Sequence, residues 1–501
     1  MGLLPAVKYA GIASACFKVL LFPAYKSTDF EVHRNWLAIT HSLPLRQWYY
    51  EHTSEWTLDY PPFFAYFEWV LSQFAWLVDK DMLVLSNLEY ASPATVYFQR
   101  TSVLMSELVL IYALNKYISI RLATPAAYAV AMSVLFSPGF LIIDYIHFQY
   151  NSMLFGILIL SVAAITEGKM LKGAILYAVL LCFKHIFLYL APAYFVYLLR
   201  AYCLDVSSCR VNTPWKLIRW KESTKLGLSV ISVFVIAFGP FIYLGQIQQL
   251  VSRLFPFSRG LCHAYWAPNL WALYSAADRV LFTGLKTVLK LQIEDKSSAT
   301  RGLVQVTSFN VLPDVSPRAT FLLTTFYQFV SLIPVLVKPS PEKFVGSLTM
   351  CGLTSFLFGW HVHEKAILVA IVPFSLMVLN DRRYLTPYFL LTVSGYVSLF
   401  PLIFTSAEAA IKYLYTFGWI FAFYNIFGDL APVTTKRVFL LDRLARLFLM
   451  GFVPMLIFAG VYDQMPMLKQ FEFLRLFVVS TYCAVGIVSS FIGLLFVLKC
   501  A

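Results

Sequence analysis

Long apolar stretches alternate with short polar segments along almost the whole chain. Several stretches are long enough to cross the ~30 Å hydrocarbon layer of a membrane as helices. They include residues 3–23, 124–143, 224–245, 384–403 and 474–498. A helix satisfies its own backbone hydrogen bonds and therefore spans lipid at this length. The pattern predicts an all-α polytopic membrane protein.

The polar segments fall into two groups by charge. The basic ones are expected in the cytosol: Lys116–Arg121, Lys169–Lys172, Arg200–Lys225, Lys338–Lys343, Arg382–Arg383 and Lys436–Arg437. The segments between them then lie on the opposite, non-cytosolic side. This alternation predicts about fourteen crossings. They are expected near 3–23, 97–115, 124–143, 152–166, 171–184, 186–203, 224–245, 318–337, 343–360, 365–379, 384–403, 409–427, 437–461 and 474–498.

The alternation holds only if two further apolar stretches do not cross. Residues 61–78 begin with two prolines and carry Glu68 among many aromatics, which is typical of a helix lying in the membrane interface. Residues 264–317 contain polar breaks and are interpreted as a long non-cytosolic loop, although two short crossings fit equally well. The expected organisation is one membrane domain over residues 1–501, with two large loops at 24–96 and 246–317.

Composition supports this class of protein. Of 501 residues, 59% are hydrophobic and only 13% are charged, which a soluble domain could not accommodate. The net charge of +13 agrees with the basic loops of a membrane protein. The basic residues form no run interleaved with stacking aromatics, so nucleic-acid binding is not indicated. The eight cysteines have neither metal-type nor disulfide-type spacing.

Ionisable residues gather at the non-cytosolic span ends, where an unpaired charge is costly and implies a function. The first loop opens with TDFEVHRNW, which contains Asp29, Glu31 and Arg34. A carboxylate at such a place can act as a general base, or it can belong to a salt-bridge cluster that anchors the loop. The same loop ends with WTLDYPP, where Asp59 and Tyr60 precede two prolines. Asp59 can cap the following helix or bind a sugar.

Two more polar groups occur at such ends. The segment DYIHFQYNS offers His147, Gln149 and Asn151 as donors and acceptors within five residues. An aromatic belt with polar tips is the alternative, but it requires fewer amide and imidazole groups. Cationic residues follow at later span ends: Lys184, His185, Arg259, His361, His363 and Lys365.

These cations suit an anionic ligand. A lysine between spans can simply extend its amine to the interface, or its ammonium can bind a phosphate. The pair His361 and His363 could hold a metal, but no further ligands follow at recognisable spacing. Contacts to a phosphate or sugar are therefore the preferred interpretation, and no metal or cofactor is expected.

A set of motifs carries a resemblance to a known family, in this order: TDFEVHRNW, WTLDYPP, HFQYNS, FKHIFLYLAPAY, RLFPFSRGL and WHVHEKAIL. They resemble the endoplasmic-reticulum glucosyltransferases that use dolichyl-phosphate glucose, which have the GT-C membrane fold. Two sister types share most of these motifs. One adds the first glucose to the lipid-linked nine-mannose oligosaccharide, and the other adds the second in α-1,3 linkage. The stretch RGLCHAYWAPNLWALY is similar to the second type.

The resemblance implies a mechanism and roles for residues. The acidic residue of the DFE-type motif, here Asp29, is expected to be the general base. The donor is β-linked and the product α-linked, so the reaction is expected to invert the anomeric carbon without a metal. Substrate contacts are expected from Glu31, Arg34, Asp59, Tyr60, His147, Gln149 and Asn151. Donor-phosphate contacts are expected from Lys184, His185, Arg259, His361, His363 and Lys365.

The resemblance also implies partners and a place in the cell. The partners are dolichyl-phosphate glucose, a dolichyl-diphosphate oligosaccharide and membrane lipid, with an active site facing the lumen of the endoplasmic reticulum. Two other classes remain open. A polytopic lipid or solute transporter is one, although neither inverted repeats nor midplane charges are evident. A non-catalytic scaffold or subunit is the other.

Overall fold

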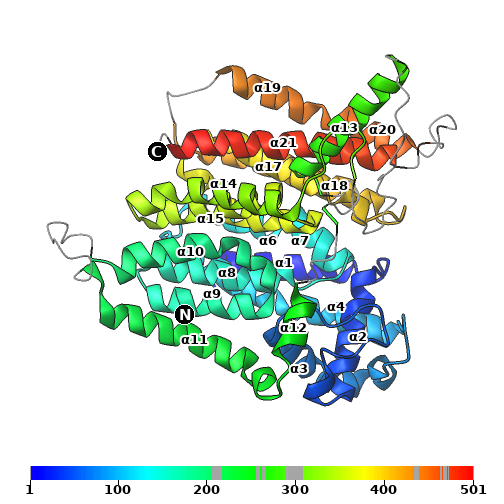
Figure 1. Cartoon of the computed structure of the whole chain (residues 1–501), viewed down its shortest axis with the longest axis vertical. Helices are drawn as coiled ribbons and strands as arrows, with labels where there is room; N and C mark the ends of the chain where they lie inside the picture. The colour runs from blue at the N-terminus through cyan, green and yellow to red at the C-terminus, as the bar shows by residue number, and fades with distance from the viewer. Residues whose placement is uncertain are drawn as a thin grey trace. The chain divides into compact units, whose positions relative to one another are not determined.

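The structure is a computed structural model of the chain (Figure 1). It describes residues 2–205, 217–255, 260, 261, 267–288, 290, 308–433, 439–462, 465, 471 and 473–499. All named elements in these ranges are helices, accompanied by one isolated bridge between Leu204 and Ile218. The prediction of an all-α protein is confirmed.

Eight helical segments of the described chain are long and apolar enough to cross a membrane. They are Pro93–Ile120, Pro125–Ile146, His185–Cys203, Trp220–Tyr243, Pro317–Val337, Arg382–Leu402, Asp442–Val461 and Leu474–Leu498. Two shorter apolar helices are Asn151–Thr166 and Met170–Phe183. The chain is therefore a polytopic membrane protein, as predicted, and the number of crossings stays a prediction.

Several span helices begin at the same local signal. Ser92, Thr124 and Ser316 each accept a backbone N–H bond from the first turn of the helix that follows. In all three cases the next residue is a proline, whose fixed φ suits the first helical position. The sequence thus sets where these helices begin.

The described helices group into two compact units. The first unit comprises residues 1–257, 339–341 and 402–419. Its helices are α1 Pro5–Val19, α2 Thr28–Ser42, α3 Pro62–Val78, α4 Pro93–Ser106, α5 Leu108–Ile120, α6 Pro125–Leu135, α7 Pro138–Phe140, α8 Asn151–Thr166, α9 Met170–Phe183, α10 Ala191–Leu198, α11 Trp220–Tyr243 and α12 Ile247–Leu254. Short 3₁₀ helices are η1 Leu45–Gln47, η2 Lys80–Leu83 and η4 His185–Leu190, and π-helical turns are η3 Leu141–Ile146 and η5 Leu199–Cys203.

The second unit comprises residues 258–338, 342–401 and 420–501. Its helices are α13 Leu270–Thr287, α14 Pro317–Val337, α15 Pro341–Phe358, α16 Leu368–Ser375, α17 Leu385–Val397, α19 Phe439–Met450, α20 Phe452–Val461 and α21 Leu474–Lys499. The 3₁₀ helices here are η8 Glu364–Ile367, η9 Val378–Asn380 and η10 Arg382–Tyr384, with η11 Phe400–Leu402 at the unit boundary. The helix α18, Ala409–Leu430, contains another such boundary, between residues 419 and 420.

Close helix packing builds the first unit. Figure 1 shows α8, α9 and α11 side by side, and α8 also packs against α5. Gly156 of α8 lies directly against the backbone of α5. A Cβ atom added at this position would come within 2.7 Å of the Leu110 nitrogen. In the first loop, α2 packs on α3 and on η2. This packing gives the loop a rigid helical base.

The second unit is organised around α21, which packs against α17 and α13. Asp278 of α13 accepts backbone N–H bonds from Asn310, Val311 and Leu312 at 3.0, 2.8 and 2.8 Å. Burial opposes its charge, but these bonds together lower the pKa of Asp278. One of the polar breaks in 264–317 thus contains a buried carboxylate that joins α13 to the segment before α14, and residues 291–307 of the same stretch lie outside the described residues.

A buried ion pair ties the first helix to its neighbours. Lys18 of α1 donates to Glu107, which lies between α4 and α5, and both side chains are 1% exposed. The Lys18 ammonium also lies 4.1 Å from the centre of the Tyr145 ring. Each charge depends on the other, because an ion without its partner is strongly destabilised in such an interior.

We expect Lys18→Met to destabilise the protein by about 3–5 kcal/mol, because Glu107 is left without its cation. The double variant Lys18→Met/Glu107→Leu should recover most of that loss, since it removes both charges. The stability of both variants can be measured by thermal unfolding in detergent, with tryptophan fluorescence as the signal.

The matched control is Lys116→Met. Lys116 pairs with Glu167 at 2.5 Å, but the two side chains are 30% and 22% exposed, so the expected cost is only ~0–1 kcal/mol. Equal melting temperatures of Lys18→Met and Lys116→Met would contradict the stabilising role of the buried ion pair between Lys18 and Glu107.

Candidate active site

Asp29 lies in the first turn of α2, at the start of the first loop. The residue before this helix, Ser27, donates through its hydroxyl to the carbonyl oxygen of His147. This bond ties the beginning of α2 to the HFQYNS turn. The Asp29 side chain is 18% exposed, and its place at a helix N-terminus favours the negative charge of the carboxylate.

The HFQYNS turn directs two side chains at Asp29. It follows the π-helical turn η3, and Phe148 within it is buried at a φ of 76°. Such strain in a non-glycine residue is often found at functional sites. Gln149 Nε2 donates to Asp29 Oδ2 at 2.6 Å, and His147 Nε2 lies 3.5 Å from the same oxygen. The strained turn therefore places an amide and an imidazole on one carboxylate.

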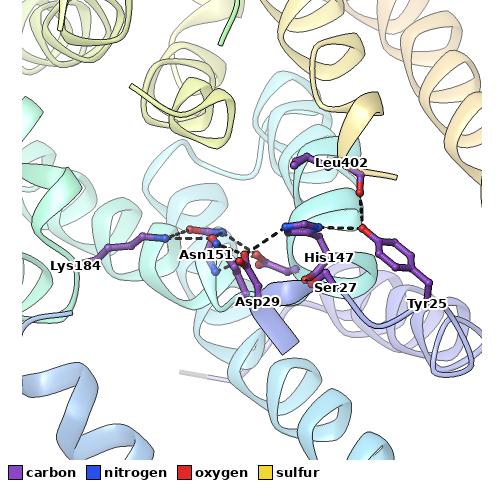
Figure 2. Close-up of polar contacts among 9 residues, drawn as sticks. Tyr25, Ser27, Asp29, His147, Asn151, Lys184 and Leu402 are labelled. Atoms are coloured by element: carbon purple, nitrogen blue, oxygen red, sulfur yellow. Dashed lines mark hydrogen bonds and ion pairs between the residues drawn. The ribbon is translucent and has the colours of Figure 1, made fainter. Parts of the chain in front are cut away.

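Lys184 lies at the other end of this polar chain. It follows α9 in an extended conformation, with φ −148° and ψ 117°. Its ammonium donates to Gln149 Oε1 at 3.2 Å and to Asn151 Oδ1 at 3.0 Å. The Asn151 amide nitrogen in turn donates to Gln149 Oε1 at 2.8 Å. Figure 2 shows the resulting line of contacts from Lys184 to Asp29.

Asp144 supports this chain and was not among the predicted site residues. Its Oδ1 accepts from the backbone and side-chain nitrogens of Asn151 at 3.1 and 3.0 Å, and its Oδ2 accepts from the Ser152 nitrogen at 2.6 Å. Asp144 is 1% exposed. The only sequence signal for Asp144 was its place at the start of DYIHFQYNS, seven residues before Asn151.

Tyr25 completes the surroundings of His147 and was also missed. Its hydroxyl lies 3.0 Å from His147 Nδ1 and donates to the carbonyl oxygen of Leu402. Arg100 donates to the Tyr25 carbonyl oxygen at 2.9 Å, and Glu408 accepts from the Tyr25 nitrogen at 2.8 Å. Burial, followed by nearby carboxylates, raises the pKa of Tyr25, so the phenol keeps its proton.

Glu31 and Arg34, predicted as substrate contacts, bind each other. The guanidinium of Arg34 donates to both Glu31 carboxylate oxygens at 2.6 and 2.7 Å. It also donates to the carbonyl oxygens of Met82 and Val84 at 2.9 and 3.3 Å. The pair thus fastens η2 to α2, which matches the salt-bridge alternative for this part of the motif. Their contact with substrate stays a prediction.

Asp59 is not the cap of α3. That helix begins at Pro62 with Pro61 as its N-cap residue, so the capping interpretation is wrong. Tyr60 packs its ring against Trp36 with centroids 4.9 Å apart, and Lys184 lies 5.0 Å from the Tyr60 ring centre. Burial, followed by the Asp59 carboxylate, raises the pKa of Tyr60. Tyr60 is therefore a neutral phenol beside the cationic end of the site.

His185, the other cation predicted in the first unit, begins η4 directly after Lys184. Its ring contacts those of Tyr60 and Phe255, with centroids 6.4 and 5.4 Å away. Arg259 lies outside the described residues. The structure thus places Lys184 and His185 together beside Tyr60.

The remaining predicted cations belong to the second unit. His361 has a φ of 51°, and its Nδ1 lies 2.8 Å from the Gly260 carbonyl oxygen. The rings of His361 and His363 are 5.2 Å apart, and Lys365 lies in η8. Among the described residues, no group of three or more His, Cys, Asp or Glu side chains is placed to hold a metal ion. That these residues bind the donor phosphate stays a prediction.

Residues 14–494 match the model of the ALG6, ALG8 glycosyltransferase family. The chain belongs to this family. A Gibberella zeae protein named dolichyl pyrophosphate Glc1Man9GlcNAc2 alpha-1,3-glucosyltransferase is 54% identical over 494 residues, covering 98% of this chain and 97% of that protein. Proteins with the same name from Schizosaccharomyces pombe and Saccharomyces cerevisiae are 54% and 46% identical, covering 99% and 96% of this chain and 98% and 90% of those proteins. The family resemblance read from the motifs is confirmed.

In this ALG6, ALG8 glycosyltransferase, three separate motifs meet at one network. TDFEVHRNW supplies Asp29, HFQYNS supplies Gln149, and FKHIFLYLAPAY supplies Lys184. A carboxylate can accept a proton from a hydroxyl, while an ammonium a short distance away can bind an anionic leaving group. The network thus contains a carboxylate at one end and an ammonium at the other, the two kinds of group that suit transfer of a sugar from a phosphate.

Proposed function

We propose that the chain transfers glucose from dolichyl-phosphate glucose to a dolichyl-diphosphate oligosaccharide that already carries one glucose, in α-1,3 linkage. The observation that carries this proposal is the high identity over nearly the full chain to relatives named for this activity. The second candidate is addition of the first glucose, because the matching family model covers both sister types.

We further propose the GT-C arrangement with about fourteen crossings, in the endoplasmic-reticulum membrane, with the loop 24–96 in the lumen. The composition of α3 supports an interfacial position for that helix. Its exposed side chains include Trp69, Phe74 and Leu77, whereas Glu68 and Ser72 are buried. A helix with apolar residues outward and polar residues inward can lie on lipid.

In the proposed mechanism Asp29 removes the proton from the acceptor 3-hydroxyl as that oxygen attacks the glucosyl carbon. The bond to the phosphate breaks on the opposite face, which inverts the anomeric carbon. A base must be ionised at working pH, and two features favour the Asp29 carboxylate. These are the helix N-terminus and the N–H bond from Gln149.

Lys184 is proposed to bind the donor phosphate and to stabilise it as it leaves. Both amide oxygens that Lys184 contacts are neutral, so these bonds position the ammonium without cancelling its charge. His185, Arg259, His361, His363 and Lys365 are proposed to share this role. Asp59, Tyr60, His147, Gln149 and Asn151 are proposed to contact the sugars, and the reaction is proposed to need no metal.

Purified protein with dolichyl-phosphate glucose should glucosylate a lipid-linked nine-mannose acceptor carrying one glucose, and not the same acceptor carrying none or two. Mass spectrometry of the released oligosaccharides measures the product. Transfer to the acceptor without glucose would identify the first-glucose activity instead. Failure with every acceptor, in monodisperse protein, would contradict glucosyl transfer and favour a transporter or scaffold.

Replacing the proposed base should affect turnover and leave donor binding intact. We expect Asp29→Asn to lower kcat by ~10² to 10⁴, the usual range for a positioned base, with little change in the donor KM. Asp59→Asn is the matched control in the same loop, and it should lower kcat far less. Near-normal kcat in Asp29→Asn with a collapse in Asp59→Asn would show that the other carboxylate is the base.

A further inference from the structure

The two ring nitrogens of His147 have different surroundings (Figure 2). Nδ1 lies 3.0 Å from the Tyr25 hydroxyl, and Nε2 lies 3.5 Å from Asp29 Oδ2. His147 is only 12% exposed, so few water molecules reach the ring. Which nitrogen carries the proton therefore follows from the partners that the protein supplies.

The contacts of the Tyr25 hydroxyl favour a proton on His147 Nδ1. Its other contact is the carbonyl oxygen of Leu402, which can only accept a hydrogen bond. Tyr25 therefore donates its single hydroxyl proton to the Leu402 carbonyl oxygen. With that proton directed at Leu402, the contact between Tyr25 and His147 is a hydrogen bond when His147 Nδ1–H donates to the Tyr25 oxygen. Neutral His147 accordingly has its lone pair on Nε2.

That lone pair faces a carboxylate. Asp29 Oδ2 already accepts the Gln149 amide proton at 2.6 Å, and a carboxylate oxygen has no proton of its own to offer. The contact between Asp29 and neutral His147 is repulsive until a proton lies between them. A proton that arrives on Asp29 therefore has an adjacent acceptor at Nε2.

We propose that His147 stores the proton that Asp29 takes from the acceptor hydroxyl. This rests on the proposed glucosyl transfer and adds a step to it. As the new bond from oxygen to the glucosyl carbon forms, the bond from that carbon to the phosphate oxygen breaks, and dolichyl phosphate leaves with the electron pair. The hydroxyl proton passes to Asp29 and then to His147 Nε2, which restores the Asp29 carboxylate. Water in the lumen finally takes the proton.

The charges around His147 permit this storage. Asp29 is the charged group printed in direct contact with the His147 ring. Glu408 and Arg100 reach it only through Tyr25, and Asp144 and Lys184 contact the neighbouring Asn151. An imidazolium would turn the repulsive contact with Asp29 into an ion pair.

The His147 backbone is held independently of its ring. Its nitrogen donates to the Ile142 carbonyl oxygen at 2.9 Å, and its carbonyl oxygen accepts from Ser27. Removal of the imidazole is therefore expected to leave the turn in place. His147→Asn is the informative variant, because its amide can still donate toward Tyr25 but cannot hold a proton.

The pH dependence of kcat tests the proposal. Wild-type activity should fall on an acidic limb as acid protonates His147 and fills the acceptor site. In His147→Asn the acidic limb should move to lower pH, where the Asp29 carboxylate itself is protonated, with kcat lower by on the order of 10² and the donor KM unchanged. The control His52→Asn replaces an exposed histidine of the first loop, the loop that carries Asp29, and it should keep the wild-type profile. An unmoved acidic limb in His147→Asn would overturn the proposal.

A second readout needs no turnover. Histidine-selective ¹⁵N NMR, with the His147 signal assigned by its loss in His147→Asn, should show the Nδ1–H tautomer. Tyr25→Phe should remove that preference, and Asp29→Asn should lower the His147 pKa. An Nε2–H tautomer in the wild type would overturn the proposal even if transfer is confirmed. An Nδ1–H tautomer in a protein that transfers no glucose would count against the proposed function alone.

Discussion

The Gln149 side-chain amide separates two opposite charges in a partly buried site. Its oxygen accepts from Lys184 and Asn151, so its nitrogen must face Asp29, where it donates at 2.6 Å. In direct contact, the Asp29 carboxylate and the Lys184 ammonium would neutralise each other. The amide instead keeps a basic group and a cationic group apart, each with its own charge. The proposed division between base and phosphate site depends on this spacing.

The surroundings of the site are fastened by two side-chain pairs of the first loop. Glu31 and Arg34 bind each other across α2, and His33 lies 2.7 Å from Glu68 of α3. Burial raises the pKa of Glu68, while His33 opposes that rise. These pairs fasten α2 to η2 and to α3. The groups around Asp29 are joined instead through neutral amides, and their charges stay directed at the place where substrate is proposed to bind.

Much of the helix arrangement and the centre of the site could be predicted from the sequence. The apolar stretches with their Ser-Pro and Thr-Pro signals mark many of the helix positions, and the motifs contain Asp29, Gln149 and Lys184. Contacts between distant segments could not be predicted. Tyr25 reaches His147 across 122 positions and Lys18 reaches Glu107 across 89. Lys18 also lies inside an apolar stretch, where nothing nearby reveals a partner. Their pairing is a property of the packed helices and not of any local pattern.

The central claim is that Asp29 acts on the incoming hydroxyl and Lys184 on the departing phosphate. Capture of the donor glucose by azide separates these roles most directly, because azide attacks as an anion and needs no base. Asp29→Ala should lose transfer to the oligosaccharide and still form α-glucosyl azide from dolichyl-phosphate glucose, whereas Lys184→Met should be impaired in both reactions. If Asp29→Ala loses azide capture as completely as it loses transfer, Asp29 is not the base and the account is wrong.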